Sequence, residues 1–438
     1  MKVITRFPPS PTGYFHIGSA RTALFNYLFA AHEGGEMRMR FEDTDTARGK
    51  KEYEDDILEG MRWLGLLGKK QAAVWKQSER TGVYRGYIKQ LIEAGHAYEA
   101  EAATDNPDKK VVRFKNPNTT VTFNDLVRGP VSFDTGELKD FIIAKSVDDP
   151  LYHLAVVVDD HEMGVTHVIR GEDHISNTQR QILILVALGY GRPAYAHIPL
   201  ILAPDRSKLS KRHGAVSVNE YRRQGFLPHA FVNYLALLGW NPGTEQEVFT
   251  LEELVKVFSL ERIHKSGAIF DKEKLLWLNH QHSKRLTDAE YAGLLKDFTD
   301  ADVSLLPVSL IKERARTFGE ATELIKSGEY DFLAEKVGYE PHLLLKGAKT
   351  DAATAKKHLK EVETLLIDVS EKVFVSEEIK NVIYPYATEQ GRSTVLWPLR
   401  VALSGREKSP DPFIIASLIG KEVTLRRIES ALSHLSTL

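Results

Sequence analysis

Residues 3–45 read VITRFPPSPTGYFHIGSARTALFNYLFAAHEGGEMRMRFEDTD, and this stretch decides the expected fold. Val3–Phe7 is a short β-prone run, which the prolines and glycine of residues 8–13 break at once. Residues 37–42 alternate apolar with charged side chains, as expected of a strand with one buried face. Between these strands the i, i+3, i+4, i+7 spacing predicts a helix, ended by Gly34 and Gly35, with apolar positions at Ala20, Ala23, Leu24, Tyr27, Leu28 and Ala31.

The alternation of strand and helix continues after residue 45. A second helix is predicted from Tyr53, Ile57, Leu58, Met61 and Leu64. This β-α-β-α order favours a parallel sheet with flanking helices, an α/β fold. An insertion is expected at about 75–150, β-rich over 100–150, where Pro107, Pro117 and Pro130 interrupt short β-prone pieces. The α/β pattern then resumes with the apolar run 154–158, a strand at 167–169, a helix through 182–186 and a strand at 198–202.

The sequence changes character again near residue 305 and becomes almost wholly helical. Spacing typical of helices covers 307–327, 350–368, 376–388 and 411–436. We therefore predict a Rossmann-like α/β domain over 1–305 and an all-helical domain over 306–438.

Composition narrows the possible function. The chain has 438 residues and a net charge of −2, so overall charge gives no sign of a nucleic-acid partner. It contains no cysteine, which excludes disulfides, thiol catalysis, thiolate zinc sites and iron–sulfur clusters. No apolar run approaches the ~20 residues that span a bilayer, so we expect a cytoplasmic protein without membrane contact.

Three short motifs suggest chemistry. PSPTGYFHIGSAR, at 9–21, precedes and opens the first helix, whose free N–H groups and dipole attract phosphate. KLSKR, at 208–212, places three cations in a loop after a strand, and FEDTD, at 41–45, places acids at a strand end. Taken singly, each motif has a plainer explanation: a Gly/Pro turn with a Ser helix cap, a solvated basic surface, and turn-forming acids.

Together the motifs resemble the bacterial-type glutamyl-tRNA synthetases, which are class I aminoacyl-tRNA synthetases, along essentially the whole chain. The matching passages, in family order, are RFPPSPTGYFHIGSARTALFNYLFA, FEDTD, YHLAVVVDDHEMGVTHVIRGEDH, KLSKR and WPLRVALSG…IASLIGKE…LRRIESAL. Ser19 stands where the general class I motif ends in a histidine, and glutamyl enzymes commonly have a small residue there.

The resemblance implies ATP-dependent attachment of L-glutamate to the 3′ end of tRNA(Glu) through a glutamyl-adenylate, with release of AMP and pyrophosphate. A non-discriminating enzyme that also charges tRNA(Gln) is the alternative. The resemblance implies catalytic roles for His16, Lys208 and Lys211, and Mg²⁺ is expected to arrive with ATP rather than in a protein cage. The ATP-binding residues it implies are Pro9, His16, Gly18, Ser19, Lys208, Ser210 and Lys211.

The resemblance also implies which side chains select glutamate, and which contact tRNA. Guanidinium groups suit the two carboxylates of glutamate, and an acidic side chain suits its ammonium group. The positions that match the family's glutamate pocket are Arg6, Ser10, Glu42, Tyr152 and Arg170. Residues 215–305 are expected to contact the tRNA stem, and Arg314 or Arg316 to face the anticodon. The helical region offers further cations for this role: Lys312, Arg392, Arg400, Arg426 and Arg427.

Many relatives carry a zinc knuckle in the insertion, but this chain has neither cysteine nor a histidine between His96 and His153. We therefore expect no structural zinc, and, as in relatives, a monomer. Glutamyl-queuosine synthetases lack an anticodon domain, and glutaminyl and archaeal-type glutamyl enzymes have β-barrel ones, so the helical C-terminal region argues against both. A small-molecule nucleotidyltransferase would need neither VIRGEDH nor this region. A catalytically dead tRNA-binding paralogue is disfavoured because His16, Lys208 and Lys211 are intact.

Overall fold

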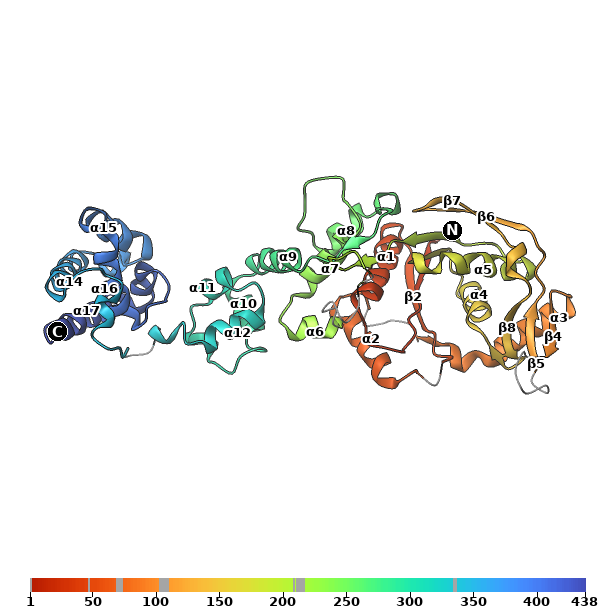
Figure 1. Cartoon of the computed structure of the whole chain (residues 1–438), viewed down its shortest axis with the longest axis horizontal. Coiled ribbons are helices and arrows are strands. Elements are labelled where there is room, and N and C mark those ends of the chain that lie inside the picture. Colours follow the sequence, from red (N-terminus) through yellow and green to blue (C-terminus); the bar gives the residue numbers. More distant parts are fainter. Residues whose placement is uncertain are drawn as a thin grey trace. The chain divides into compact units, whose positions relative to one another are not determined.

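The structure is a computed structural model that describes residues 2–45, 48–67, 74–101, 110–207, 209, 217–333 and 337–438. The chain forms two compact units, Met1–His282 and Ser283–Leu438. Figure 1 colours the first from red to green and the second from teal to blue. The division falls earlier than the predicted position 305, because residues 283–304 already form helices that pack with those of the second unit.

Parallel strands form the centre of the first unit. β1 (Ile4–Phe7) pairs with β2 (Glu36–Phe41), and β2 pairs with β3 (Trp75–Lys76), all in parallel. β10 (His167–Gly171) lies on the other side of β1, where Thr166 N donates to Ile4 O at 2.9 Å, and it pairs in parallel with β11 (Ala194–Ile198). This doubly wound arrangement confirms the α/β prediction.

Helix α1 (Ile17–His32) connects β1 to β2 and packs on both strands and on α7 (Pro228–Leu237). Of the predicted apolar positions, Ala20, Ala23, Leu24 and Leu28 are fully buried in this core, whereas Tyr27 is partly buried against it. Because β1, β2 and β10 are parallel, their carboxyl ends lie at one edge of the sheet, the edge at which doubly wound folds bind ligands. The predicted site residues Arg6, Glu42 and Arg170 lie at or just beyond these three ends.

The expected β-rich insertion is present, although it is not one separate sheet. An antiparallel sheet has the order β4-β5-β8-β9, and the hairpin of β6 and β7 joins the main sheet through β11. The insertion begins with α3 (Thr81–Glu93). The six strands are β4 (Ala97–Glu101), β5 (Lys110–Phe114), β6 (Thr120–Asp125), β7 (Gly129–Asp134), β8 (Phe141–Ser146) and β9 (Asp149–Pro150).

One predicted strand is wrong in its bounds. Residues 198–202 do not form a single strand, because Pro199 interrupts the pairing after β11. Ile201–Leu202 is instead β12, which pairs in parallel with β13 (Ala268–Ile269). The remaining helices of this unit are α2 (Lys51–Trp63), α4 (Tyr152–Glu162), α5 (Ile175–Ala187), α6 (Val218–Arg223), α8 (Leu251–Val257) and α9 (Lys272–Lys284), which extends two residues past the boundary.

The second unit is helical in its described part, as predicted. Two of the expected segments, 350–368 and 376–388, are confirmed as single helices. The segment 411–436 is interrupted at Gly420, whose φ of 81° is not helical, and 307–327 is divided at residues 315–317, where Thr317 caps a new helix. Its helices are α10 (Asp288–Leu295), α11 (Val308–Arg314), α12 (Phe318–Lys326), α13 (Leu343–Lys346), α14 (Ala352–Ile367), α15 (Ser376–Gln390), α16 (Arg392–Ser404) and α17 (Pro412–Leu435).

Candidate active site

A cavity of about 1520 Å³ opens at the carboxyl edge of the parallel sheet. Nine of the twelve residues predicted to bind ATP or glutamate line it: Arg6, Pro9, Ser10, His16, Gly18, Ser19, Glu42, Tyr152 and Arg170. The other three, Lys208, Ser210 and Lys211, lie outside the described residues. Leu209 between them does line the cavity.

The HIG segment forms the start of α1 at the cavity. His16 is the N-cap, rather than Ser19, and the two residues form a capping box. His16 Nδ1 accepts from Ser19 N at 3.2 Å, and Ser19 Oγ accepts from His16 N at 3.2 Å. A Cβ atom at position 18 would lie only 3.2 Å from the His16 ring, so glycine at this position leaves room for the ring. Because His16 Nδ1 accepts, its proton is on Nε2, and that nitrogen is a donor.

Leu209 and Ser217, the described residues on either side of residues 210–216, both line the cavity. Leu209 N donates to Ile201 O at 3.1 Å on one side, and Val218 N donates to Phe15 O at 2.8 Å on the other. Ser217 also forms a β-bridge with His16. The described chain on either side of residues 210–216 is therefore attached at the wall of the cavity.

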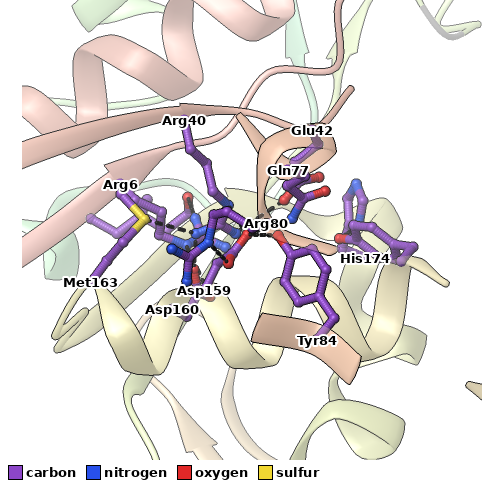
Figure 2. A network of polar contacts seen from close by, with 12 residues as sticks. Arg6, Arg40, Glu42, Gln77, Arg80, Tyr84, Asp159, Asp160, Met163 and His174 are labelled. Carbon is purple, nitrogen blue, oxygen red and sulfur yellow. Dashed lines mark hydrogen bonds and ion pairs between the residues drawn. The ribbon is translucent and has the colours of Figure 1, made fainter. Parts of the chain in front are cut away.

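Behind the cavity lies a network of buried ion pairs, shown in Figure 2. Arg40 is fully buried and donates to Asp160 Oδ1 at 2.5 Å and to Glu42 Oε1 at 3.0 Å. Arg6 Nε donates to both oxygens of Asp160 at 3.2 Å. The network continues to Asp159, a second acid on α4, which accepts from Gln77, Arg80 and Tyr84 at 2.8–2.9 Å.

The charges of this network balance, and the pKa values follow the contacts. Burial alone would raise the pKa of Asp160, but Arg40 and Arg6 outweigh it and hold the pKa below its usual range. Burial raises the pKa of Glu42, although Arg40 opposes the shift. Three carboxylates (Glu42, Asp159, Asp160) thus face three guanidinium groups (Arg6, Arg40, Arg80). The Arg6 charge is already compensated within the protein.

Arg170 differs from Arg6, because among the described residues it has no acidic partner. Its Nε donates to His197 Nε2 at 3.1 Å and its Nη2 to Thr178 Oγ1 at 2.7 Å, both neutral acceptors. Its Nη1 is buried and makes no hydrogen bond to the described residues. Burial lowers the pKa of this guanidinium, whose residue is only 6% exposed. A buried cation with one free donor at a cavity wall is suited to an anionic ligand.

Tyr152 lies beside Arg170 in the cavity wall and contacts a histidine that the sequence analysis did not single out. The Tyr152 hydroxyl lies 3.1 Å from His174 Nδ1. Burial, followed by the charge of Arg170, lowers the pKa of His174 to about 4, so the ring is neutral near pH 7. Burial raises the pKa of Tyr152 as well.

Several site residues were missed by the sequence analysis: Arg40, Asp159, Asp160, His174 and His197. Two signals could have found some of them. Asp159 and Asp160 interrupt the apolar helix YHLAVVVDDHE, and His174 ends VIRGEDH. The two acids of FEDTD that follow Glu42 have different surroundings. Asp43 accepts from Ser78 N at 2.8 Å, which is a structural contact, whereas Asp45 lines the cavity.

Among the described residues, no group of three or more His, Asp or Glu side chains lies close enough together to hold a metal ion. In the part of the chain that the structure covers, no helix is both long and apolar enough to cross a bilayer.

Comparisons with known proteins agree with this geometry. Residues 2–106 and 99–277 match the family model of class I tRNA synthetases (E and Q), catalytic domain, and residues 270–432 match an anticodon binding domain. A glutamate–tRNA ligase of Nitratidesulfovibrio vulgaris is 40% identical over 98% of this chain and 99% of its own. One from Desulforamulus reducens is 38% identical over 99% of this chain and 100% of its own.

A solved structure also matches this chain over nearly its whole length. The glutamate tRNA ligase of Elizabethkingia meningosepticum, in complex with its amino acid, has a TM-score of 0.83 and 30% identity, and each chain covers 99% of the other. The resemblance drawn from the motifs is thereby confirmed, as is a class I catalytic domain followed by a helical anticodon-binding domain. The chain belongs to the glutamate–tRNA ligase family of class I aminoacyl-tRNA synthetases.

Proposed function

We propose that this chain attaches L-glutamate to the 3′ end of tRNA(Glu) in two steps, through a glutamyl-adenylate formed from ATP. The observation that carries the proposal is the composition of the cavity. A helix N-terminus with a donor histidine, His16, and a buried guanidinium without an acidic partner among the described residues, Arg170, line the same cavity. The first feature suits the phosphates of ATP, and the second suits a carboxylate of the amino acid.

Glutamate would be held by groups of opposite charge. Arg170 would bind one carboxylate through its free Nη1, and Glu42, which lines the cavity beside Arg40, would bind the ammonium group. Arg6, Ser10 and Tyr152 would complete the pocket from the same wall. Glutamine lacks the negative charge that Arg170 needs, and this difference supports selection of the acid over the amide.

Activation of glutamate by ATP requires that the reactants be positioned and the phosphate charge be neutralised, more than covalent chemistry by the protein. His16, Gly18 and Ser19 would hold the phosphates and adenosine at the start of α1, next to Pro9. The other side of the phosphates would be held by the KLSKR loop, whose described neighbours are attached at the cavity wall, through Lys208, Ser210 and Lys211. Mg²⁺ would come with ATP and neutralise phosphate charge.

Lys211→Ala is expected to lower glutamyl-adenylate formation by ~100-fold, because loss of one electrostatic donor to the transition state typically costs ~3 kcal/mol. ATP–pyrophosphate exchange in the presence of tRNA(Glu) measures the effect. Lys211→Arg, which keeps the charge, is the matched control and should retain more activity. Exchange by the alanine variant within threefold of the unaltered chain would remove this role from Lys211.

The second unit would read the anticodon. Single-stranded bases are usually read by stacking on arginine or aromatic planes and by hydrogen bonds to their edges. Arg314 is paired with Glu329 and Arg316 with Glu320, and both side chains are about 40% exposed, so each is accessible to a base. The prediction that Arg427 offers a cation for tRNA is wrong, because the residue is only 6% exposed and its Nη1 donates to Phe332 O at 2.8 Å.

Binding of tRNA is therefore expected to depend on the anticodon. The full chain should bind tRNA(Glu) at least ~10-fold more tightly than the same tRNA with a swapped anticodon, about 1.4 kcal/mol. Filter-binding titrations of the two tRNAs measure this difference. Equal affinities would contradict anticodon reading by the second unit.

ATP–pyrophosphate exchange with glutamate, glutamine or aspartate, each with and without tRNA, tests the function as a whole. Exchange supported by glutamate alone among the three is the expected result, and exchange with another acid in its place would refute it. The names of the relatives give no support to charging of tRNA(Gln). That the chain acts as a cytoplasmic monomer stays a prediction.

A further inference from the structure

We propose that His197 and Asp125 are positioning residues that aim the Arg170 guanidinium at the substrate carboxylate. They would do so by holding the His197 ring neutral, with its proton on Nδ1. The inference deepens the proposed function and rests on it, since it assigns glutamate selection to a pair of residues behind the cavity wall. Neither residue lines the cavity.

Asp125 is fixed by backbone donors at the end of β6. Its Oδ1 accepts from Val127 N at 3.0 Å and from Arg128 N at 2.8 Å. The backbone N of His197, on the neighbouring strand β11, donates to both oxygens at 3.1–3.2 Å. The residue is 1% exposed, and these contacts, led by His197, hold the pKa of Asp125 below its usual range although burial opposes the shift.

The orientation of Asp125 decides which nitrogen of His197 carries the proton. Asp125 Oδ2 lies 2.6 Å from His197 Nδ1, and a carboxylate can only accept, so Nδ1 must donate. On the other side of the ring, Nε2 lies 3.1 Å from Arg170 Nε, which can only donate, so Nε2 must accept. Both contacts are satisfied by a single form, the neutral ring protonated on Nδ1.

A neutral ring is also what the surroundings favour. His197 is fully buried, and burial together with the charge of Arg170 lowers its pKa, against the opposing effect of Asp125. Thr178 Oγ1 lies 3.1 Å from the same Nε2 and accepts from Arg170 Nη2 at 2.7 Å. Among the described residues, the acceptors of Arg170 are thus the ring and the hydroxyl, and neither of them accepts from Nη1.

The ring has an advantage over a direct carboxylate contact. A carboxylate placed against Arg170 would compensate its charge, as Asp160 compensates Arg6, and would compete with the substrate. Because the imidazole of His197 lies between Asp125 and Arg170, Asp125 fixes the direction of the guanidinium without contacting it. The substrate then supplies the anion that the buried cation lacks.

Asp125→Asn is the sharpest test, because it keeps size and shape. If the amide oxygen of the new side chain keeps the backbone donors of Val127 and Arg128, its NH₂ faces His197 Nδ1 and moves the ring proton to Nε2, against Arg170 Nε–H. We expect the KM for glutamate to rise at least ~10-fold, about 1.4 kcal/mol, with the KM for ATP within about twofold of the unaltered chain. Nitrogen NMR of the His197 ring should show the proton move from Nδ1 to Nε2.

Replacements of His197 separate its acceptor from its bulk. The amide oxygen of Gln can occupy the place of Nε2, so His197→Gln should keep the glutamate KM within ~5-fold, whereas His197→Phe, which retains a ring without an acceptor, should raise it at least ~20-fold. In the His197→Gln background Asp125→Asn should add little, because no ring proton remains to be moved. Such non-additivity would not arise from two independent structural defects.

Aminoacylation of tRNA(Glu) by the full-length variants gives these constants, with thermal unfolding as the check on folding. An unchanged glutamate KM in both Asp125→Asn and His197→Phe would overturn the inference, as would equal rises in the glutamate and ATP KM values. If His197→Phe does not fold, Asp125→Asn and the NMR signal decide alone. Failure of the unaltered chain to use glutamate would refute the proposed function instead, so the two failures are distinguishable.

Discussion

Arg170→Gln is expected to lower kcat/KM for glutamate by ~1000-fold without destabilising the protein. Loss of a buried charged partner costs a bound carboxylate about 2–5 kcal/mol. In the free protein, however, the guanidinium is a buried cation whose described partners, His197 and Thr178, are neutral. Removing it should leave the free energy of unfolding unchanged or raise it by about 1 kcal/mol, because a desolvated charge disappears and the neutral amide can still donate to these acceptors.

Aminoacylation kinetics and denaturant unfolding of the same preparation measure the two effects. Use of glutamine, however slow, should fall far less than use of glutamate, because the amide has no charge to compensate. Arg180→Gln, on the next helix and outside the cavity, is the matched control and should change neither quantity by more than about 0.5 kcal/mol. A kcat/KM for glutamate within about threefold of the unaltered chain in Arg170→Gln would exclude Arg170 from substrate binding.

The sequence predicted those parts of the site that lie in continuous motifs. His16, Gly18 and Ser19 follow from one loop and helix start, and their shared place on the cavity wall is a property of local structure. Arg6, Glu42 and Arg170 were predicted because each matches a family motif, and each ends or follows a β-prone run whose carboxyl end the parallel sheet brings to the same edge. Periodicity likewise located α11, α12, α14, α15 and α17 of the second unit, since their buried faces repeat with the helical spacing, but it did not single out α10, α13 or α16.

Contacts between distant segments were not predictable in the same way. No local pattern tells which carboxylate meets Arg40, because Asp160 is 120 positions away on a helix, and the pairing depends on how α4 packs on the sheet. The same holds for Asp125 and His197, which meet only because the β6–β7 hairpin joins the main sheet through β11. Arg427 looked like a surface cation because helical spacing alone did not show that Phe332 and Leu403 would accept from it.

Arg40→Gln is expected to lower the free energy of unfolding by about 3–5 kcal/mol, the usual cost of leaving a buried charge without its partner. Arg40 is the one guanidinium of the network that contacts all three carboxylates, Asp160, Glu42 and Asp159. Without it, three buried acids share Arg6 and Arg80. Arg38→Gln is the matched control on the same strand, because Arg38 is 40% exposed and pairs with an exposed Glu36, so its loss should cost no more than about 1 kcal/mol.

The loss of unfolding free energy in Arg40→Gln should also depend on pH, and the buried carboxylates determine the direction of this dependence. Burial already raises the pKa of Glu42 against the opposition of Arg40, so removing Arg40 raises it further. A carboxyl group whose pKa is higher in the folded than in the unfolded state favours folding at low pH and loses that contribution as the pH rises through its folded pKa. The difference in unfolding free energy between the variant and the unaltered chain should therefore shrink as the pH falls from about 8 to about 5. Urea titrations across this range measure it, and a difference that grows toward low pH would contradict a role for Arg40 in compensating buried carboxylates.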